Sequence, residues 1–91
     1  MTALTTKMIL DEILKHEKVS HFSDLSLERV KEFQDKQITK TVEFESDSDF
    51  DDFMDELKKI FKESRVYQPT AVKILTNAYI MCLEEKNQLN T

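Results

Sequence analysis

The sequence predicts a mainly α-helical, α+β protein of about four helices, with one short strand between the second and third helices. Four separate stretches place apolar residues three and four positions apart, which is the period of an amphipathic helix. Residues 37–45 instead alternate apolar and polar side chains, as a half-buried strand does. The length of 91 residues suits one small domain, 1–91. We expect a helical N-terminal part, 1–36, and a strand-helix-helix part, 37–86.

The first helix is expected over residues 5–18, where Thr5 or Thr6 can cap it. Its apolar face is broad, which favours contact with more than one neighbouring element. After a polar loop, Ser26 is expected to cap a second helix that covers residues 27–36.

The strand expected over residues 37–45 is the only convincing strand pattern in the chain. Its two faces consist of Ile38, Val42 and Phe44 with Lys40 between them, and of Gln37, Thr39, Thr41, Glu43 and Glu45. A lone strand exposes a row of backbone donors and acceptors, so it needs a partner. That partner is expected to be the same strand of a second copy, another protein, or a short extension near residues 19–23.

The clearest helix is expected over residues 49–64. Its apolar stripe is continuous and consists of Phe50, Phe53, Met54, Leu57, Ile60 and Phe61. A turn follows, and Pro69 suits the first position of a last helix over 69–86. Ten of the thirteen residues in 71–83 are apolar, so this helix is expected to lie centrally or at an interface.

The chain contains no glycine. Loops that cradle phosphate need glycine for close approach of the backbone, so a P-loop or a dinucleotide fingerprint is excluded. Chain reversals are therefore expected to use Ser, Asp, Asn and the single proline, Pro69.

The net charge of −5 disfavours nucleic acid, because proteins that bind nucleic acid usually present a basic face. The N-terminus lacks the basic and apolar regions of a secretory signal, and no stretch is apolar enough to span a membrane. The single cysteine, Cys82, cannot form an internal disulfide. We therefore expect a cytoplasmic protein with no membrane partner.

The acidic segment ESDSDFDDFMDE, residues 45–56, contains seven carboxylates. Three of them match the first acidic positions of an EF-hand calcium loop: Asp47, Asp49 and Asp51. The glycine that this loop requires is replaced by Asp52, and its last glutamate is replaced by Lys58. No metal is therefore expected at this segment.

The same segment also has the pattern of a helix start. Asp47 or Ser48 can cap the helix, and the helix dipole favours acidic side chains in the first turn. Seven acids exceed what one helix start needs, so an acidic docking surface, one that could imitate phosphate, stays open beside the helix-start interpretation. The protein-binding residues of that surface would be Asp47, Asp49, Asp51, Asp52 and Asp55.

Other candidates for chemistry are few. His16 and His21 lie near Glu12 and Glu17, but their spacing crosses from a helix end into a loop, so no zinc site is expected. Cys82 has mainly apolar helical neighbours and is expected to be a buried structural cysteine. Without a catalytic constellation or a cofactor motif, we expect a protein that is not an enzyme and needs no cofactor.

The order strand, helix, turn, helix in residues 37–86 resembles a ribbon-helix-helix DNA-binding protein. The resemblance implies a dimer whose paired strands enter the major groove. It also implies that Gln37, Thr39 and Thr41 read bases, while the opposite strand face packs in the dimer core.

The acidity instead favours a small, non-catalytic regulatory protein that acts by protein–protein interaction, such as an inhibitor, an antitoxin-like factor or a phage-type regulator. It would bind a protein partner through an acidic and apolar surface, and a homodimer would pair its strand. The alternative is a dimeric ribbon-helix-helix-like transcriptional regulator.

Overall fold

The computed structural model describes residues 4–37, 42–45 and 47–89, and this part of the chain is mainly helical, as predicted. The elements are β1 (Leu4–Thr5), α1 (Thr6–Glu17), the 3-10 helix η1 (Phe22–Asp24), α2 (Leu27–Asp35), β2 (Phe44–Glu45), α3 (Ser48–Phe61) and α4 (Gln68–Leu89). No helix in the described residues is long and apolar enough to cross a bilayer.

Side-chain caps fix the starts of the first three helices. The capping hydrogen bonds run from the Met8 N–H to Thr5 (3.2 Å), from the Arg29 N–H to Ser26 (3.1 Å) and from the Phe50 N–H to Asp47 (3.2 Å). Each cap satisfies a backbone donor that the first turn leaves without a partner. The predicted cap at Ser26 is confirmed, and of the predicted alternatives Thr5 or Thr6 and Asp47 or Ser48, the caps are Thr5 and Asp47.

The ends of α1 and α3 differ from the prediction. Both helices end on a lysine in the left-handed region, at Lys18 (φ 60°) and Lys62 (φ 57°). Glycine usually occupies this position because a Cβ disfavours the conformation. Reversals in this chain are thus not confined to Ser, Asp, Asn and Pro, because two lysines take the place of the missing glycines.

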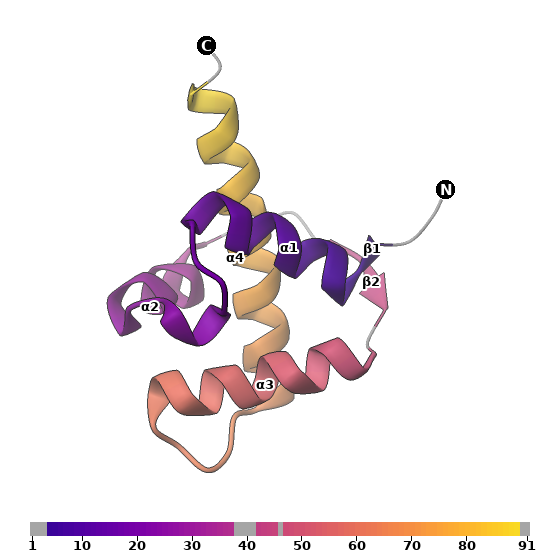
Figure 1. Cartoon of the computed structure of the whole chain (residues 1–91), viewed down its shortest axis with the longest axis vertical. Coiled ribbons are helices and arrows are strands. Elements are labelled where there is room, and N and C mark those ends of the chain that lie inside the picture. Colours follow the sequence, from indigo (N-terminus) through magenta and orange to yellow (C-terminus); the bar gives the residue numbers. More distant parts are fainter. Residues whose placement is uncertain (1–3, 38–41, 46, 90–91) are drawn as a thin grey trace.

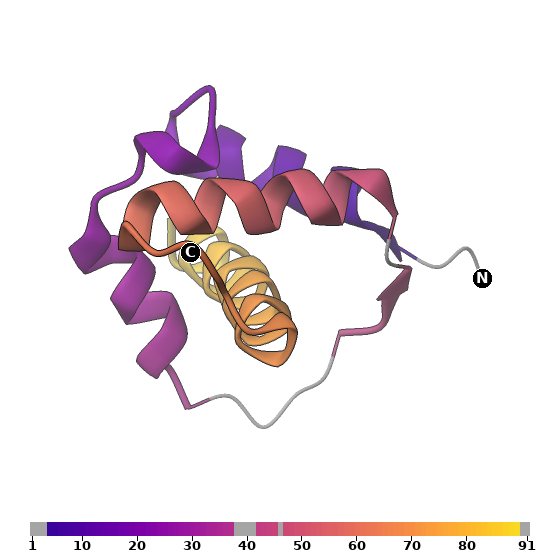
Figure 2. The ribbon, with the colours of Figure 1, turned by 90° about the horizontal axis from the view of Figure 1, so that it is seen from below.

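The fold is organised around α4 (Figure 1). Helices α1, α2 and α3 all contact it, and Figure 2, which looks nearly along α4, shows α2 and α3 on different sides of it. The core consists of Ile9, Ile13, Phe22, Val30, Phe33, Phe50, Phe53, Leu57, Ala71, Ile74, Leu75 and Ala78. The expectation of a central last helix is confirmed.

The two strands pair in parallel within the chain, with Leu4 opposite Phe44 and Thr5 opposite Glu45. The structure assigns strand only to the last two residues of the stretch 37–45, and residues 38–41 lie outside the described part. The partner expected near residues 19–23 is wrong, because this segment consists of a loop and the first two residues of η1. The strand pairs instead with a two-residue segment directly before α1, and pairing across a dimer stays a prediction.

Candidate functional site

The acidic segment at the start of α3 divides into carboxylates that support the fold and carboxylates that do not. Asp47 caps the helix, and Asp55 pairs with Lys58 at 3.4 Å. The carboxylate of Glu56 accepts a hydrogen bond of 2.8 Å from the Ser23 N–H, which ties α3 to η1. Two of the five predicted protein-binding residues, Asp47 and Asp55, therefore have local structural partners.

Three other predicted residues, Asp49, Asp51 and Asp52, make no side-chain hydrogen bond or ion pair with any described residue. Asp51 and Asp52 are exposed, and Asp49 is partly buried. Asp49 and Asp52 lie one turn apart, where two like charges weaken an isolated helix by about 0.2–0.5 kcal/mol. The helix dipole offsets part of this repulsion at an N-terminus.

A small hollow of about 120 Å³ lies beside these carboxylates, between α1, the segment before η1, and α3. Its apolar lining comes from Leu10, Leu14, Phe22 and Phe53, and its carboxylates come from Asp49, Asp52 and Glu56. No lysine or arginine is among the described residues that line it. The lining therefore combines apolar side chains with three carboxylates, beside Ser20 and His21, and the sequence did not predict this hollow.

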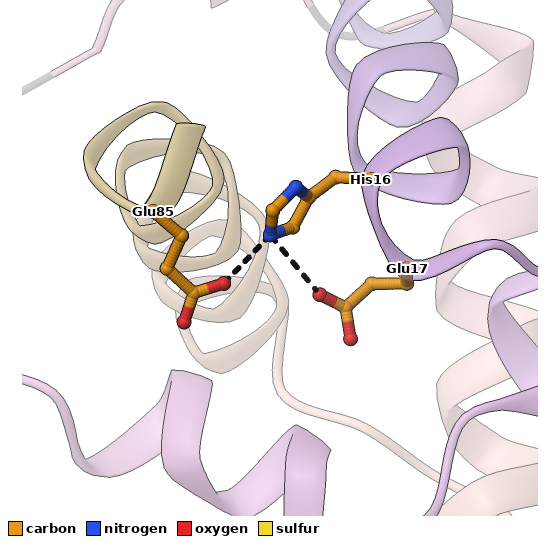
Figure 3. Close-up of side chains that lie close together, drawn as sticks. All are labelled: His16, Glu17 and Glu85. Atoms are coloured by element: carbon orange, nitrogen blue, oxygen red, sulfur yellow. Dashed lines mark hydrogen bonds and ion pairs between the residues drawn. The ribbon is translucent and has the colours of Figure 1, made fainter. Parts of the chain in front are cut away.

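A second group of charged side chains joins α1, α2 and α4. His16 and Glu17 from α1 meet Glu85 from α4, as Figure 3 shows. The His16 Nε2 lies 2.7 Å from Glu85 Oε1 and 3.9 Å from Glu17 Oε2. Arg29 from α2 completes the group, because its Nε and Nη2 donate to the two oxygens of Glu17, each at 2.8 Å.

The ligand atoms of His16, Glu17 and Glu85 lie within 4.8 Å of one another, and imidazole with carboxylates is a donor set that zinc accepts. The Nη2 of Arg29, however, donates at 2.8 Å to both Glu17 and Glu85. A metal ion bound by these carboxylates would have to separate them from a guanidinium whose side chain is only 21% exposed. The geometry therefore favours an ion-pair network over a metal site.

The electrostatics of this network follow from its hydrogen bonds. The contacts with Glu17 and Glu85 raise the pKa of Arg29, so its positive charge is secure. Burial acts to raise the pKa of Glu85, but the hydrogen bonds and charges of His16 and Arg29 outweigh it, and the pKa is lowered. The network thus joins α2 to α1 through Arg29 and Glu17, and α2 to α4 through Arg29 and Glu85.

Cys82 is buried, as predicted. Burial raises the pKa of its thiol, which disfavours the nucleophilic thiolate. The Sγ lies 3.5 Å from the Glu12 carbonyl oxygen, to which it donates. Nearby, Lys86 from α4 forms an ion pair with Glu12 from α1. The hydrogen bond and the positive charge of Lys86 lower the pKa of Glu12.

The three residues of the DNA-binding alternative cannot be compared as a set, because Thr39 and Thr41 lie outside the described residues. Gln37 is exposed and lies outside any strand. The ribbon-helix-helix resemblance implies that the strand pairs with a second copy, whereas β2 pairs with β1 in the same chain. Nothing in the described residues favours this alternative over a protein-binding function.

Arg29, Asn77 and Glu85 were not singled out from the sequence. Arg29 and Glu85 lie 56 residues apart, and Asn77 lies 44 and 41 residues from its partners Phe33 and Lys36, so no local pattern reveals these contacts. Tyr67 was missed for another reason. It stands in the turn RVYQP, and an aromatic residue in a polar turn is the signal that could have pointed to it.

Comparisons with known proteins place the chain in no family: no protein-family model, no curated protein and no solved structure matches it.

Proposed function

We propose that this chain is a non-catalytic regulatory protein that binds a basic segment of another protein through the acidic end of α3. The observation that carries the proposal is the set of three carboxylates without a partner among the described residues, Asp49, Asp51 and Asp52, beside an apolar hollow. These charges exceed what capping and the helix dipole use. A basic partner would turn their mutual repulsion into attraction.

The hollow gives this surface a second feature that suits such a partner. Lysine and arginine bury their aliphatic stems against apolar surface while the charged group stays in a polar setting. The apolar lining from Leu10, Leu14 and Phe22 fits the stem, and the carboxylates of Asp49 and Asp52 in the same lining fit the charged group. Such an opposite charge also speeds association at low salt.

The state of the reactive side chains supports the non-catalytic part of the proposal. The Cys82 thiol is buried, and burial raises its pKa. The His16 Nε2 lies 2.7 Å from Glu85 Oε1, within the network that joins α1, α2 and α4, which supports a structural role for this ring.

Affinity capture from the native host, read by mass spectrometry, tests the proposal. The triple variant Asp49→Lys, Asp51→Lys, Asp52→Lys should lose the captured protein while its helical circular dichroism is retained. The matched control makes the same charge change at exposed acids elsewhere: Glu28→Lys, Asp35→Lys, Glu84→Lys. If both variants capture the partner as well as the unaltered chain does, the acidic end of α3 is not the contact surface.

A further inference from the structure

We infer that the turn between α3 and α4 forms a second docking surface, which binds an acidic segment of a partner protein. This surface, called the Tyr67 surface below, consists of Met54, Lys58, Arg65, Val66, Tyr67 and Pro69. It lies at the opposite end of α3 from Asp49, Asp51 and Asp52, and it does not depend on the function proposed for that end.

Tyr67 is the most exposed large apolar side chain among the described residues. It is 78% exposed, whereas the next, Met8, is 50% exposed. Tyrosine, arginine and methionine are enriched in the centres of protein interfaces, and the Tyr67 surface contains one of each. A ring held this far into water contributes little to the core, so its contact area is available to a partner.

Two hollows adjoin the segment Arg65 to Tyr67. One, of about 620 Å³, lies against the C-terminal half of α3 and the start of α4. The other, of about 370 Å³, lies toward α2 and is lined in part by Lys31, Gln34 and Phe61. Both include Arg65, Val66 and Tyr67, so an extended segment could cross this ridge and place side chains on either side of Tyr67.

The charge of the two hollows identifies the partner's chemistry. Their lining contains three cations, Lys31, Lys58 and Arg65, and one acid, Glu63. Lys58 pairs with Asp55 at 3.4 Å, so the positive charge that is left for a partner comes from Lys31 and Arg65, in a chain whose net charge is −5. Arg65 makes no ion pair with any described residue, and its planar guanidinium suits a carboxylate.

An acidic protein segment fits this surface better than nucleic acid does. DNA carries a charge about every 1.7 Å, and binding usually requires many phosphate contacts. Three cations beside Glu63 offer few such contacts, and the overall negative charge of the chain opposes a long polyanion. A segment that alternates acidic and apolar residues would use both the cations and the apolar lining from Met54, Phe61 and Val66.

Titration of the isotope-labelled full chain by nuclear magnetic resonance tests this inference. The probe is the synthetic peptide Glu-Glu-Leu-Glu-Glu-Phe-Glu-Glu, and its control replaces every Glu by Gln. The acidic peptide should cause saturable shifts of the Met54, Lys58, Arg65 and Tyr67 amide signals. High salt should weaken the binding, and the glutamine peptide should bind at least about tenfold more weakly.

The double variant Arg65→Glu, Tyr67→Ala should weaken binding of the acidic peptide by at least about tenfold. The matched control, Lys7→Glu, Met8→Ala, makes the same type of change at exposed residues of α1 and should bind as the unaltered chain does. All four positions are exposed, so both variants are expected to fold. Tyr67→Ala alone provides a milder variant for the same measurement.

Three results would overturn the inference: shifts that do not saturate or that fall elsewhere, equal binding of the glutamine peptide, and tighter binding of an oligothymidylate through the same residues. The variant with Asp49, Asp51 and Asp52 changed to Lys separates the two surfaces. This variant should bind the acidic peptide at the Tyr67 surface as tightly as the unaltered chain does. That result is expected whether or not the variant still captures the partner of the acidic end of α3. Loss of that affinity in this variant would contradict a separate surface.

Discussion

A single buried amide, that of Asn77, closes one end of α2. Asn77 belongs to α4 and is 5% exposed. The Nδ2 donates to the carbonyl oxygens of Phe33 at 2.7 Å and of Lys36 at 3.1 Å. The last carbonyl groups of a helix have no hydrogen-bond donor within the helix. The Asn77 amide supplies that donor to carbonyl oxygens that would otherwise be buried without one.

Asn77→Ala should therefore lower the free energy of unfolding by about 1–3 kcal/mol, because it leaves carbonyl oxygens without a donor. Urea denaturation followed by circular dichroism measures the change, and the slope against urea should stay the same. Asn87→Ala, at an exposed position of the same helix, serves as the control and should change the value by less than about 0.5 kcal/mol. Equal effects of the two variants would contradict the role given to Asn77.

The carboxylate of Glu85 links stability to pH. Its folded pKa lies below the ordinary value of 4.5, because the hydrogen bonds and charges of His16 and Arg29 outweigh burial, which acts to raise the pKa. As the pH falls, the unfolded state therefore binds the proton first. The resulting stabilisation is complete above the unfolded pKa and is lost as the pH falls through the folded pKa.

Glu85→Gln should thus make the free energy of unfolding less sensitive to pH between about pH 6 and about pH 3. Urea denaturation at several pH values gives the slope for each protein. Glu84→Gln changes a neighbouring exposed acid that makes no ion pair with a described residue, and it should leave the slope close to that of the unaltered chain. If the slope in Glu85→Gln were unchanged, the network would not control how stability falls in acid.

At the scale of elements, the two left-handed lysines are the clearest departure from a relaxed backbone. Lys18 and Lys62 end α1 and α3 with positive φ, and their N–H groups bond to carbonyls four residues back. Glycine adopts this conformation without a Cβ penalty.

Lys18→Gly and Lys62→Gly should each raise the free energy of unfolding by about 0.5–1 kcal/mol. Thermal and urea unfolding measure the gain, and the double variant should add the two effects because the sites lie on different helices. Lys15→Gly, inside α1 at an exposed position, should instead lower stability by about 1 kcal/mol. A loss at Lys18 as large as at Lys15 would contradict the cap geometry.

The four helices were predictable because each has an apolar stripe, and three begin at a side-chain cap. The prediction of 27–36 became Leu27–Asp35, and that of 49–64 became Ser48–Phe61. The strand pairing was not predictable, because Leu4–Thr5 is too short to show an alternating pattern. Each residue of β1 pairs with a residue of β2 that lies 40 positions later in the sequence, and no local rule connects the two strands.

The candidate site was predictable in part. The helix-start pattern left the cap open between Asp47 and Ser48, and the structure shows Asp47. The pattern could not separate Asp55, which pairs with Lys58, from Asp52, which pairs with no described residue. That division depends on side-chain positions. The hollow beside Asp52 needs α1, η1 and α3 together, so it exists only once the tertiary fold has formed.

At the scale of the whole molecule, α4 is the element that α1, α2 and α3 all contact. Its segment 71–78 supplies four of the core residues, whereas Leu83 and Glu84 beyond it are exposed. Moving α1, α2 or α3 away from the core therefore requires contacts with α4 to break. Stability against local opening is expected to be greatest in the middle of this helix.

Amide hydrogen exchange should accordingly be slowest within residues 74–82 and faster by several orders of magnitude at residues 84–89 of the same helix. Exchange followed by magnetic resonance, residue by residue, provides the measurement. If the amides of α2 exchanged more slowly than those of the middle of α4, the core would be centred elsewhere.

The exposure of Tyr67 has an optical consequence. The chain contains no tryptophan and two tyrosines, Tyr67 and Tyr79, so ultraviolet emission arises from these two rings. Tyr79 is partly buried against the core, whereas Tyr67 is 78% exposed. A collisional quencher such as acrylamide reaches the exposed ring far more readily. The emission that this quencher removes therefore reports on the turn between α3 and α4, without any label attached to the protein.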